Sequence, residues 1–164
     1  MKIFFCWLAF VCGLYVLQAS FFPLVAYNGV SPDLVILLVV SFSFLKGQRM
    51  GVFMGFLVGL LQDLASGTFF GTNIFSKMLI GYLGGVFANR VFREQVFLPL
   101  FASVMATALN YAVMVMFMFL LGHSLNLIVH LQQTLLPMIW YNMLFSVPVH
   151  RCVALLCDRL LEKK

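Results

Sequence analysis

Apolar residues dominate the chain in long runs, and short polar stretches separate these runs. A helix needs about 20 residues to cross the hydrocarbon core of a bilayer. Measured against this length, the pattern predicts six transmembrane helices, at about residues 3–22, 30–45, 50–67, 73–89, 95–121 and 126–148. The second run is short and the last two are long, so we expect helices of unequal length and tilt.

Composition supports a membrane protein. Hydrophobic residues make up 63% of the chain and charged residues only 9%, whereas soluble domains carry about a quarter charged residues. The connections between the runs are short, about a dozen residues or fewer. We therefore expect an all-α integral membrane protein, with residues 1–164 forming a single polytopic domain.

The basic residues predict the topology, because short cytoplasmic loops accumulate Lys and Arg. Nine of the ten basic residues fall on one side of the predicted spans: Lys2, Lys46, Arg49, Arg90, Arg93, Arg151, Arg159, Lys163 and Lys164. Six spans with both termini in the cytoplasm satisfy this distribution. Membrane topology accounts for the net charge of +5, so we expect no nucleic-acid partner.

The two ends of the chain each allow a second interpretation. The first run could be a cleaved signal peptide, but it continues through Phe21 and Phe22 without an A-x-A cleavage site, which favours a span. After Pro148, residues 149–164 alternate apolar and charged positions. They form either a cytoplasmic amphipathic helical tail, which could bind membrane lipid or a protein, or an extension of the last span.

Motifs for catalysis or metal binding are absent from the sequence. The cysteines Cys6, Cys12, Cys152 and Cys157 have neither the spacing nor the histidine neighbours of zinc or redox sites. Glycine-rich phosphate loops, nucleophile elbows and metalloprotease motifs are missing as well. We expect no enzyme activity, no catalytic residues, no cofactor and no metal.

Asp63 and Lys77 are charged residues that fall inside the third and fourth predicted spans. Such residues are costly in a membrane and usually face protein, water or each other. Each lies about one turn inside the outer end of its span, and the short connection predicts antiparallel neighbours. We therefore expect an intramembrane ion pair, with either a structural role or a role in proton or ligand binding.

Glycines at every fourth position continue from these two residues. Gly51, Gly55 and Gly59 form one ridge, and Gly81 and Gly85 form another. Small residues at this spacing let two membrane helices approach closely. If Asp63 faces Lys77, then Gly59 faces Gly81 and Gly55 faces Gly85.

The start of the second span has its own local signals. In SPDLV, Ser31 is the expected N-cap, Pro32 the first helical residue, and Asp33 a first-turn carboxylate near the positive end of the helix dipole. Capping is the local explanation of Asp33.

Residues 32–90 resemble MreD, the rod shape-determining membrane protein family of bacteria. The matching features are the Pro32–Asp33 entry, the glycine-rich span that ends in GLLQDLASG at Gly67, the G-x-N turn of Gly71 and Asn73, and the GYLGG of the fourth span. Chain length and the six-span pattern extend the resemblance beyond these residues.

The resemblance implies a non-catalytic scaffold of the elongasome in the bacterial inner membrane. It would regulate cell shape and lateral peptidoglycan synthesis through direct association with MreC, together with MreB, RodA and a class B penicillin-binding transpeptidase. The family fold is similar to the substrate-binding subunits of energy-coupling factor transporters. The alternative is therefore a subunit that binds a vitamin-like molecule, with Asp63, Lys77, Asn110 and Asn142 as polar contacts. Interhelical hydrogen bonding is the simpler role for Asn110 and Asn142.

Overall fold

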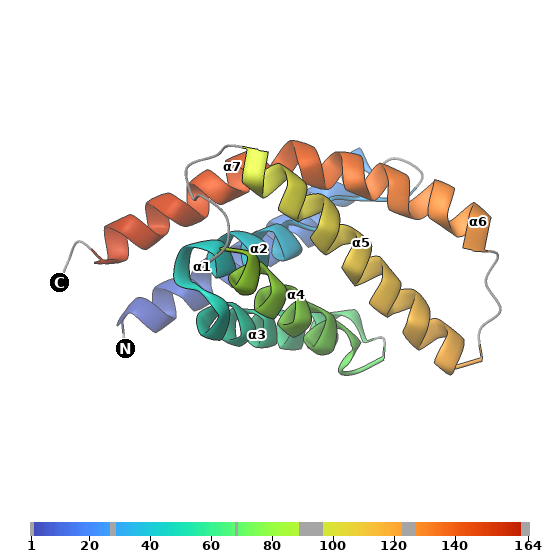
Figure 1. The fold of residues 1–164 in the computed structure, drawn as a ribbon, viewed down its shortest axis with the longest axis horizontal. Helices are drawn as coiled ribbons and strands as arrows, with labels where there is room; N and C mark the ends of the chain where they lie inside the picture. Colours follow the sequence, from blue (N-terminus) through green and yellow to red (C-terminus); the bar gives the residue numbers. More distant parts are fainter. Residues whose placement is uncertain (1, 27–28, 68, 89–96, 123–126, 162–164) are drawn as a thin grey trace.

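The computed structural model describes residues 2–26, 29–67, 69–88, 97–122 and 127–161, and this part of the chain is all-helical (Figure 1). Its elements are α1 (Lys2–Ser20), the 3-10 helix η1 (Phe22–Val25), α2 (Leu34–Lys46), α3 (Gln48–Ser66), α4 (Thr72–Ala88), α5 (Phe97–Leu120), α6 (Leu127–His130), the π-helix η2 (Leu131–Leu135) and α7 (Leu136–Leu161). Because α6, η2 and α7 follow one another without a break, six helical segments correspond to the six predicted runs.

Three segments are long and apolar enough to cross a membrane, among the residues that the structure describes. They are Phe5–Val25, Leu98–Leu120 and Leu131–Arg159, and Leu34–Lys46 is a shorter apolar helix. The helices α3 and α4 are less apolar because glycines and polar residues interrupt them. The chain is therefore a membrane protein, in which helices of unequal length pack together.

Helix α2 lies at the centre of the molecule. Every residue from Leu34 to Phe44 is buried, and α1, α3, α4, α5 and α7 all contact this helix. A helix that is hydrophobic on all sides is normally a buried one. With 13 residues, α2 is about 20 Å long, which is shorter than the roughly 30 Å hydrocarbon core. Its surroundings are mostly protein.

Asp33 begins α2, two residues after the N-cap predicted from the sequence. Its carboxylate accepts a hydrogen bond from the backbone N–H of Ile36 at 3.1 Å, so Asp33 and not Ser31 is the N-cap. At the other end Gly47 alone separates α2 from α3, with a φ of 82° that favours glycine. This single-residue turn directs α3 back along α2.

The predicted glycine ridges lie in the contact between α3 and α4, but in a different register. A side chain on Gly51 would meet the backbone of Gly81, and one on Gly55 would overlap the carbonyl of Lys77. Gly59 faces the backbone of Asn73, which is eight positions before Gly81, so the helices are shifted by about two turns.

Gly85 completes this contact at the other end of α4. A Cβ there would overlap the backbone of Gln48, beside the turn between α2 and α3. In a membrane, such close backbone approach stabilises helix association through van der Waals contact.

Helix α7 continues through Pro148 to Leu161, so the structure shows residues 149–161 as an extension of the last segment. Val149, Val153 and Cys157 are buried on one face, whereas Arg151 is exposed. The buried face of this segment packs against protein. The start of α1, the end of α7 and the α2–α3 turn lie toward the same end of the molecule (Figure 1).

Substituting Gly55 by Ala should destabilise the protein, because the added methyl group overlaps the backbone of Lys77 and forces α3 and α4 apart. Overpacking of this kind costs about 1–3 kcal/mol. We expect a lower midpoint in thermal unfolding of the detergent-purified protein.

The matched control is Gly13→Ala in α1, where a Cβ meets nothing within 4 Å. It should leave the midpoint unchanged or raise it, since Ala favours helix more than Gly. Equal midpoints for the two variants would contradict the close packing of α3 and α4.

Candidate functional site

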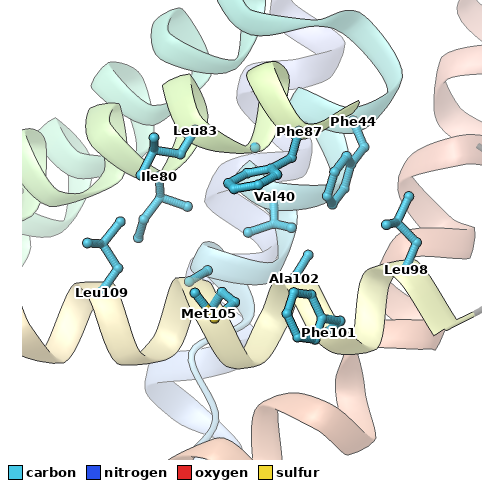
Figure 2. Close-up of a pocket in the computed structure, with 12 residues that line it drawn as sticks. Val40, Phe44, Ile80, Leu83, Phe87, Leu98, Phe101, Ala102, Met105 and Leu109 are labelled. Atoms are coloured by element: carbon cyan, nitrogen blue, oxygen red, sulfur yellow. The ribbon is translucent and has the colours of Figure 1, made fainter. Parts of the chain in front are cut away.

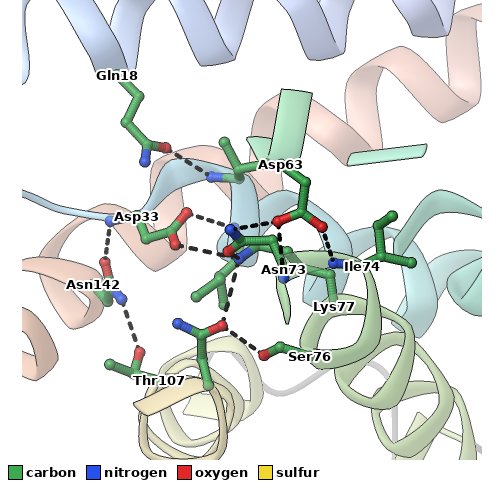
Figure 3. Close-up of polar contacts among 12 residues, drawn as sticks. Gln18, Asp33, Asp63, Asn73, Ile74, Ser76, Lys77, Thr107 and Asn142 are labelled. Carbon is green, nitrogen blue, oxygen red and sulfur yellow. Dashed lines mark hydrogen bonds and ion pairs between the residues drawn. The ribbon is translucent and has the colours of Figure 1, made fainter. Parts of the chain in front are cut away.

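Buried polar side chains from four helices and the N-cap of α2 meet at one place, which we call the polar junction (Figure 3). Each of them is at most 8% exposed. The members are Asp33 at the start of α2, Asp63 of α3, Asn73, Ser76 and Lys77 of α4, Thr107 and Asn110 of α5, and Asn142 of α7.

Asp63 binds the N-terminus of α4. Its carboxylate accepts hydrogen bonds from the backbone N–H groups of Gly71, Asn73 and Ile74, at 2.8, 3.1 and 3.2 Å. The side-chain amide of Asn73 adds a fourth bond at 2.9 Å. The first N–H groups of a helix have no partner within the helix, and the positive end of its dipole favours a carboxylate. Asp63 therefore fixes the start of α4 against the end of α3.

Lys77 is 1% exposed and bonds to amide oxygens. Its Nζ donates to Oδ1 of Asn73 at 2.9 Å and to Oδ1 of Asn110 at 3.4 Å. Its ion pair is with Asp33, whose Oδ2 lies 3.9 Å away. Lys77 thus joins α4 to α5 and to the start of α2.

The prediction of a direct ion pair between Asp63 and Lys77 is therefore wrong. Asn73 lies between the two residues, donating to Asp63 and accepting from Lys77 (Figure 3). The physical reason is the register of the helices, because the backbone of Lys77 packs on Gly55, eight positions before Asp63.

Asn142 forms a second branch of the polar junction. Its Oδ1 accepts from the backbone N–H of Asp33 at 2.8 Å, and its Nδ2 donates to Oγ1 of Thr107, also at 2.8 Å. Nearby, the hydroxyl of Ser76 donates to Oδ1 of Asn110 at 2.6 Å. These bonds connect α7 and α5 to the start of α2, and α4 to α5.

Asn110 and Asn142 thus form hydrogen bonds between helices, which is the simpler of the two roles that the sequence suggested for them. Ser76 and Thr107 were missed from the sequence. Ser76 directly precedes Lys77 in α4. Thr107 is three positions before Asn110, and this spacing places Thr107 and Asn110 on one face of α5. That spacing was the available signal.

The other motif positions surround the polar junction at the ends of helices. Gly67 ends α3 with a φ of 61°, and Gly71 precedes α4 with a φ of 101°. Both values favour glycine. Pro32 is fully buried beside the N-cap Asp33. The motif residues therefore shape the helix ends at which Asp33, Asp63 and Asn73 come together.

The electrostatics of the polar junction favour a structural role. Two carboxylates and one amine are removed from solvent, and buried charges are stable only with charged or hydrogen-bonding partners. Both carboxylates bind backbone N–H groups at a helix N-terminus, and the amine lies between amide oxygens and Asp33. The arrangement fixes the relative positions of five helices.

Replacing Lys77 by Met should strongly destabilise the protein, because Asp33 loses its cation and Asn73 loses a donor. Removing one partner of a buried pair typically costs about 3–5 kcal/mol. Asp33→Asn combined with Lys77→Met should be less destabilising than the sum of the two single changes. Thermal unfolding of the purified single and double variants measures this coupling.

Arg151→Met, at an exposed position of α7, is the control and should change stability little. Strict additivity of Asp33→Asn and Lys77→Met would show that these residues do not interact.

Comparison with known proteins agrees with the resemblance seen in the sequence. The family model of the rod shape-determining protein MreD matches residues 1–160 of the 164-residue chain. No curated protein and no solved structure matches significantly. Proteins of this family are structural membrane proteins of the cell-shape elongasome. Because the match covers nearly the whole chain, the protein belongs to the rod shape-determining protein MreD family.

Proposed function

We propose that the protein is a non-catalytic membrane scaffold of the elongasome. It associates directly with MreC, and through that complex with MreB, RodA and a class B penicillin-binding transpeptidase, to guide lateral peptidoglycan synthesis. The observation that carries this proposal is the family match over residues 1–160. The proposed location is the bacterial inner membrane, with six crossings and both termini in the cytoplasm.

The construction of the core supports a scaffold. The polar junction ties α2, α3, α4, α5 and α7 together with hydrogen bonds that side chains make to backbone N–H groups and to one another. A helix bundle held in this way presents fixed outer faces to its neighbours in the membrane.

The outer faces support association within the membrane. Along α7, Leu136, Trp140 and Leu144 are 53%, 72% and 71% exposed and recur at every fourth position. This spacing aligns them on one side of the helix. Such a stripe can contact lipid or a transmembrane helix of a partner.

The vitamin-binding alternative has no specific observation in its favour. The four polar residues named for that alternative already form hydrogen bonds within the polar junction. They are Asp63, Lys77, Asn110 and Asn142. A cavity between α2, α4 and α5 is lined by apolar side chains and glycine, with none of these four residues.

Depletion of the protein in its rod-shaped host should produce round cells, and expression of the intact chain should restore rods. The reason is that the wall-synthesis machinery loses the membrane scaffold that positions it. Cell width and length, measured by microscopy, test this expectation. Cells that stay rod-shaped after complete depletion would refute the proposed function.

Site-specific photo-crosslinking tests the direct contact with MreC. A benzophenone amino acid is placed at Val16 of α1, Phe75 of α4 or Leu144 of α7, all exposed on the outside of the bundle. We expect an adduct with MreC from one of these faces and none from the fully buried control position Val39. Absence of adducts from every exposed position in cells with restored shape would argue against direct MreC binding.

A further inference from the structure

An apolar groove runs between α4 and α5, with α2 as its floor (Figure 2). Its volume is about 330 Å³. Val40, Ile80 and Ala106 are buried at its base, whereas Phe87 and Phe101 are 53% and 68% exposed at its rim. We call this feature the α4–α5 groove. It is open along the outside of the bundle, where the membrane surrounds the protein.

The polar junction closes one end of the groove. Ile80 and Leu109 are its last lining residues in that direction, and Asn110 follows Leu109 directly. There the Ser76 hydroxyl bridges to Asn110 at 2.6 Å and holds α4 against α5. An occupant can therefore extend toward the junction but cannot pass it.

The other end of the groove lies beside basic residues. Phe44 and Leu98 line this end (Figure 2). Lys46 is two residues after Phe44, and Arg49 is in the first turn of α3. The close contact of Gly85 with Gln48 places the end of α4 next to the same turn. Both basic residues therefore belong to the α2–α3 corner, toward the same end of the bundle as Phe44 and Leu98.

The dimensions of the groove select a thin occupant. From Leu98 to Leu109 the groove follows eleven residues of α5, or about 16 Å. Spread over that length, its volume corresponds to a mean cross-section of about 20 Å². A helix about 10 Å in diameter has a cross-section of about 80 Å². One hydrocarbon chain fits within this space, whereas a helix lying over the groove could insert only its side chains.

We propose that the α4–α5 groove binds one acyl chain of an anionic phospholipid, with the chain end toward the polar junction and the phosphate near Lys46 and Arg49. Three features agree on this occupant: the apolar lining, the closed end with a narrow cross-section, and the basic residues of the α2–α3 corner toward the other end. Each buried methylene of the chain adds favourable transfer free energy.

The test is native mass spectrometry of the full chain, purified in mild detergent from membranes of phosphatidylethanolamine and phosphatidylglycerol. Wild-type protein should retain one phospholipid, mainly phosphatidylglycerol. Ala102→Trp, which fills the groove, should lose it. The matched control Ala112→Trp is on the same helix at an exposed position outside the groove and should retain the lipid. Equal retention by the two variants, or no lipid on the wild type, would overturn the proposal.

The headgroup position is tested by Lys46→Gln with Arg49→Gln. This double variant should lose the preference for phosphatidylglycerol over phosphatidylethanolamine, whereas Arg151→Gln with Arg159→Gln, which removes the same charge from exposed positions of α7, should keep it. An unchanged preference in the first double variant would overturn the placement of the phosphate.

A measurement on the wild-type protein keeps the proposal testable if Ala102→Trp does not fold. The protein is reconstituted in vesicles of the same two lipids with a trace of phosphatidylglycerol that carries a diazirine on one acyl chain. After illumination, labelled peptides should concentrate on the groove-lining parts of α4 and α5. Even labelling of all outer faces would overturn the proposal.

Discussion

The bonds between Asp63 and the first turn of α4 constrain much of the rest of the structure. They hold α4 at one height against α3, because the backbone N–H groups of Asn73, Ile74 and the preceding Gly71 converge on one carboxylate of α3. With that register, Gly51 meets Gly81 and Gly55 meets the backbone of Lys77. The Lys77 amine then lies between Asn73, Asn110 and Asp33, where it links the helix pair to α2 and α5.

This dependence on polar bonds and glycines follows from the solvent. Lipid tails are as apolar as leucine side chains, so the hydrophobic effect does little to join helices within a bilayer. Close backbone contact and interhelical hydrogen bonds must do so instead. Here α2 supplies a buried apolar centre, the glycines let α3 approach α4, and the polar junction fixes which helix ends meet. The same junction closes the α4–α5 groove through Ser76 and Asn110.

Much of the fold and of the polar junction is readable from the chain. The hydrophobic runs mark the six helical segments to within a few residues, except that α7 continues to Leu161. Asp63, Lys77, Asn110 and Asn142 stand out because polar groups within apolar runs need partners. Their partners are harder to predict, since one turn of helix sliding exchanges every contact. The N-cap shows the same limit, because Ser31 and Asp33 are both good caps and only the bond to Ile36 decides between them.

The sequence by itself determined that this is a helical membrane protein of the MreD family, with glycine-rich third and fourth helices and a few costly polar residues inside them. Composition and periodicity are local properties of the chain. The bilayer constrains them, because a helix that crosses it must be long and apolar enough to span the hydrocarbon core. Only the tertiary structure decided that Asp63 binds a helix end, that Lys77 pairs with Asp33, and that α4 and α5 leave a groove. The reason is that these contacts join residues far apart in the chain, so they depend on the relative heights of packed helices.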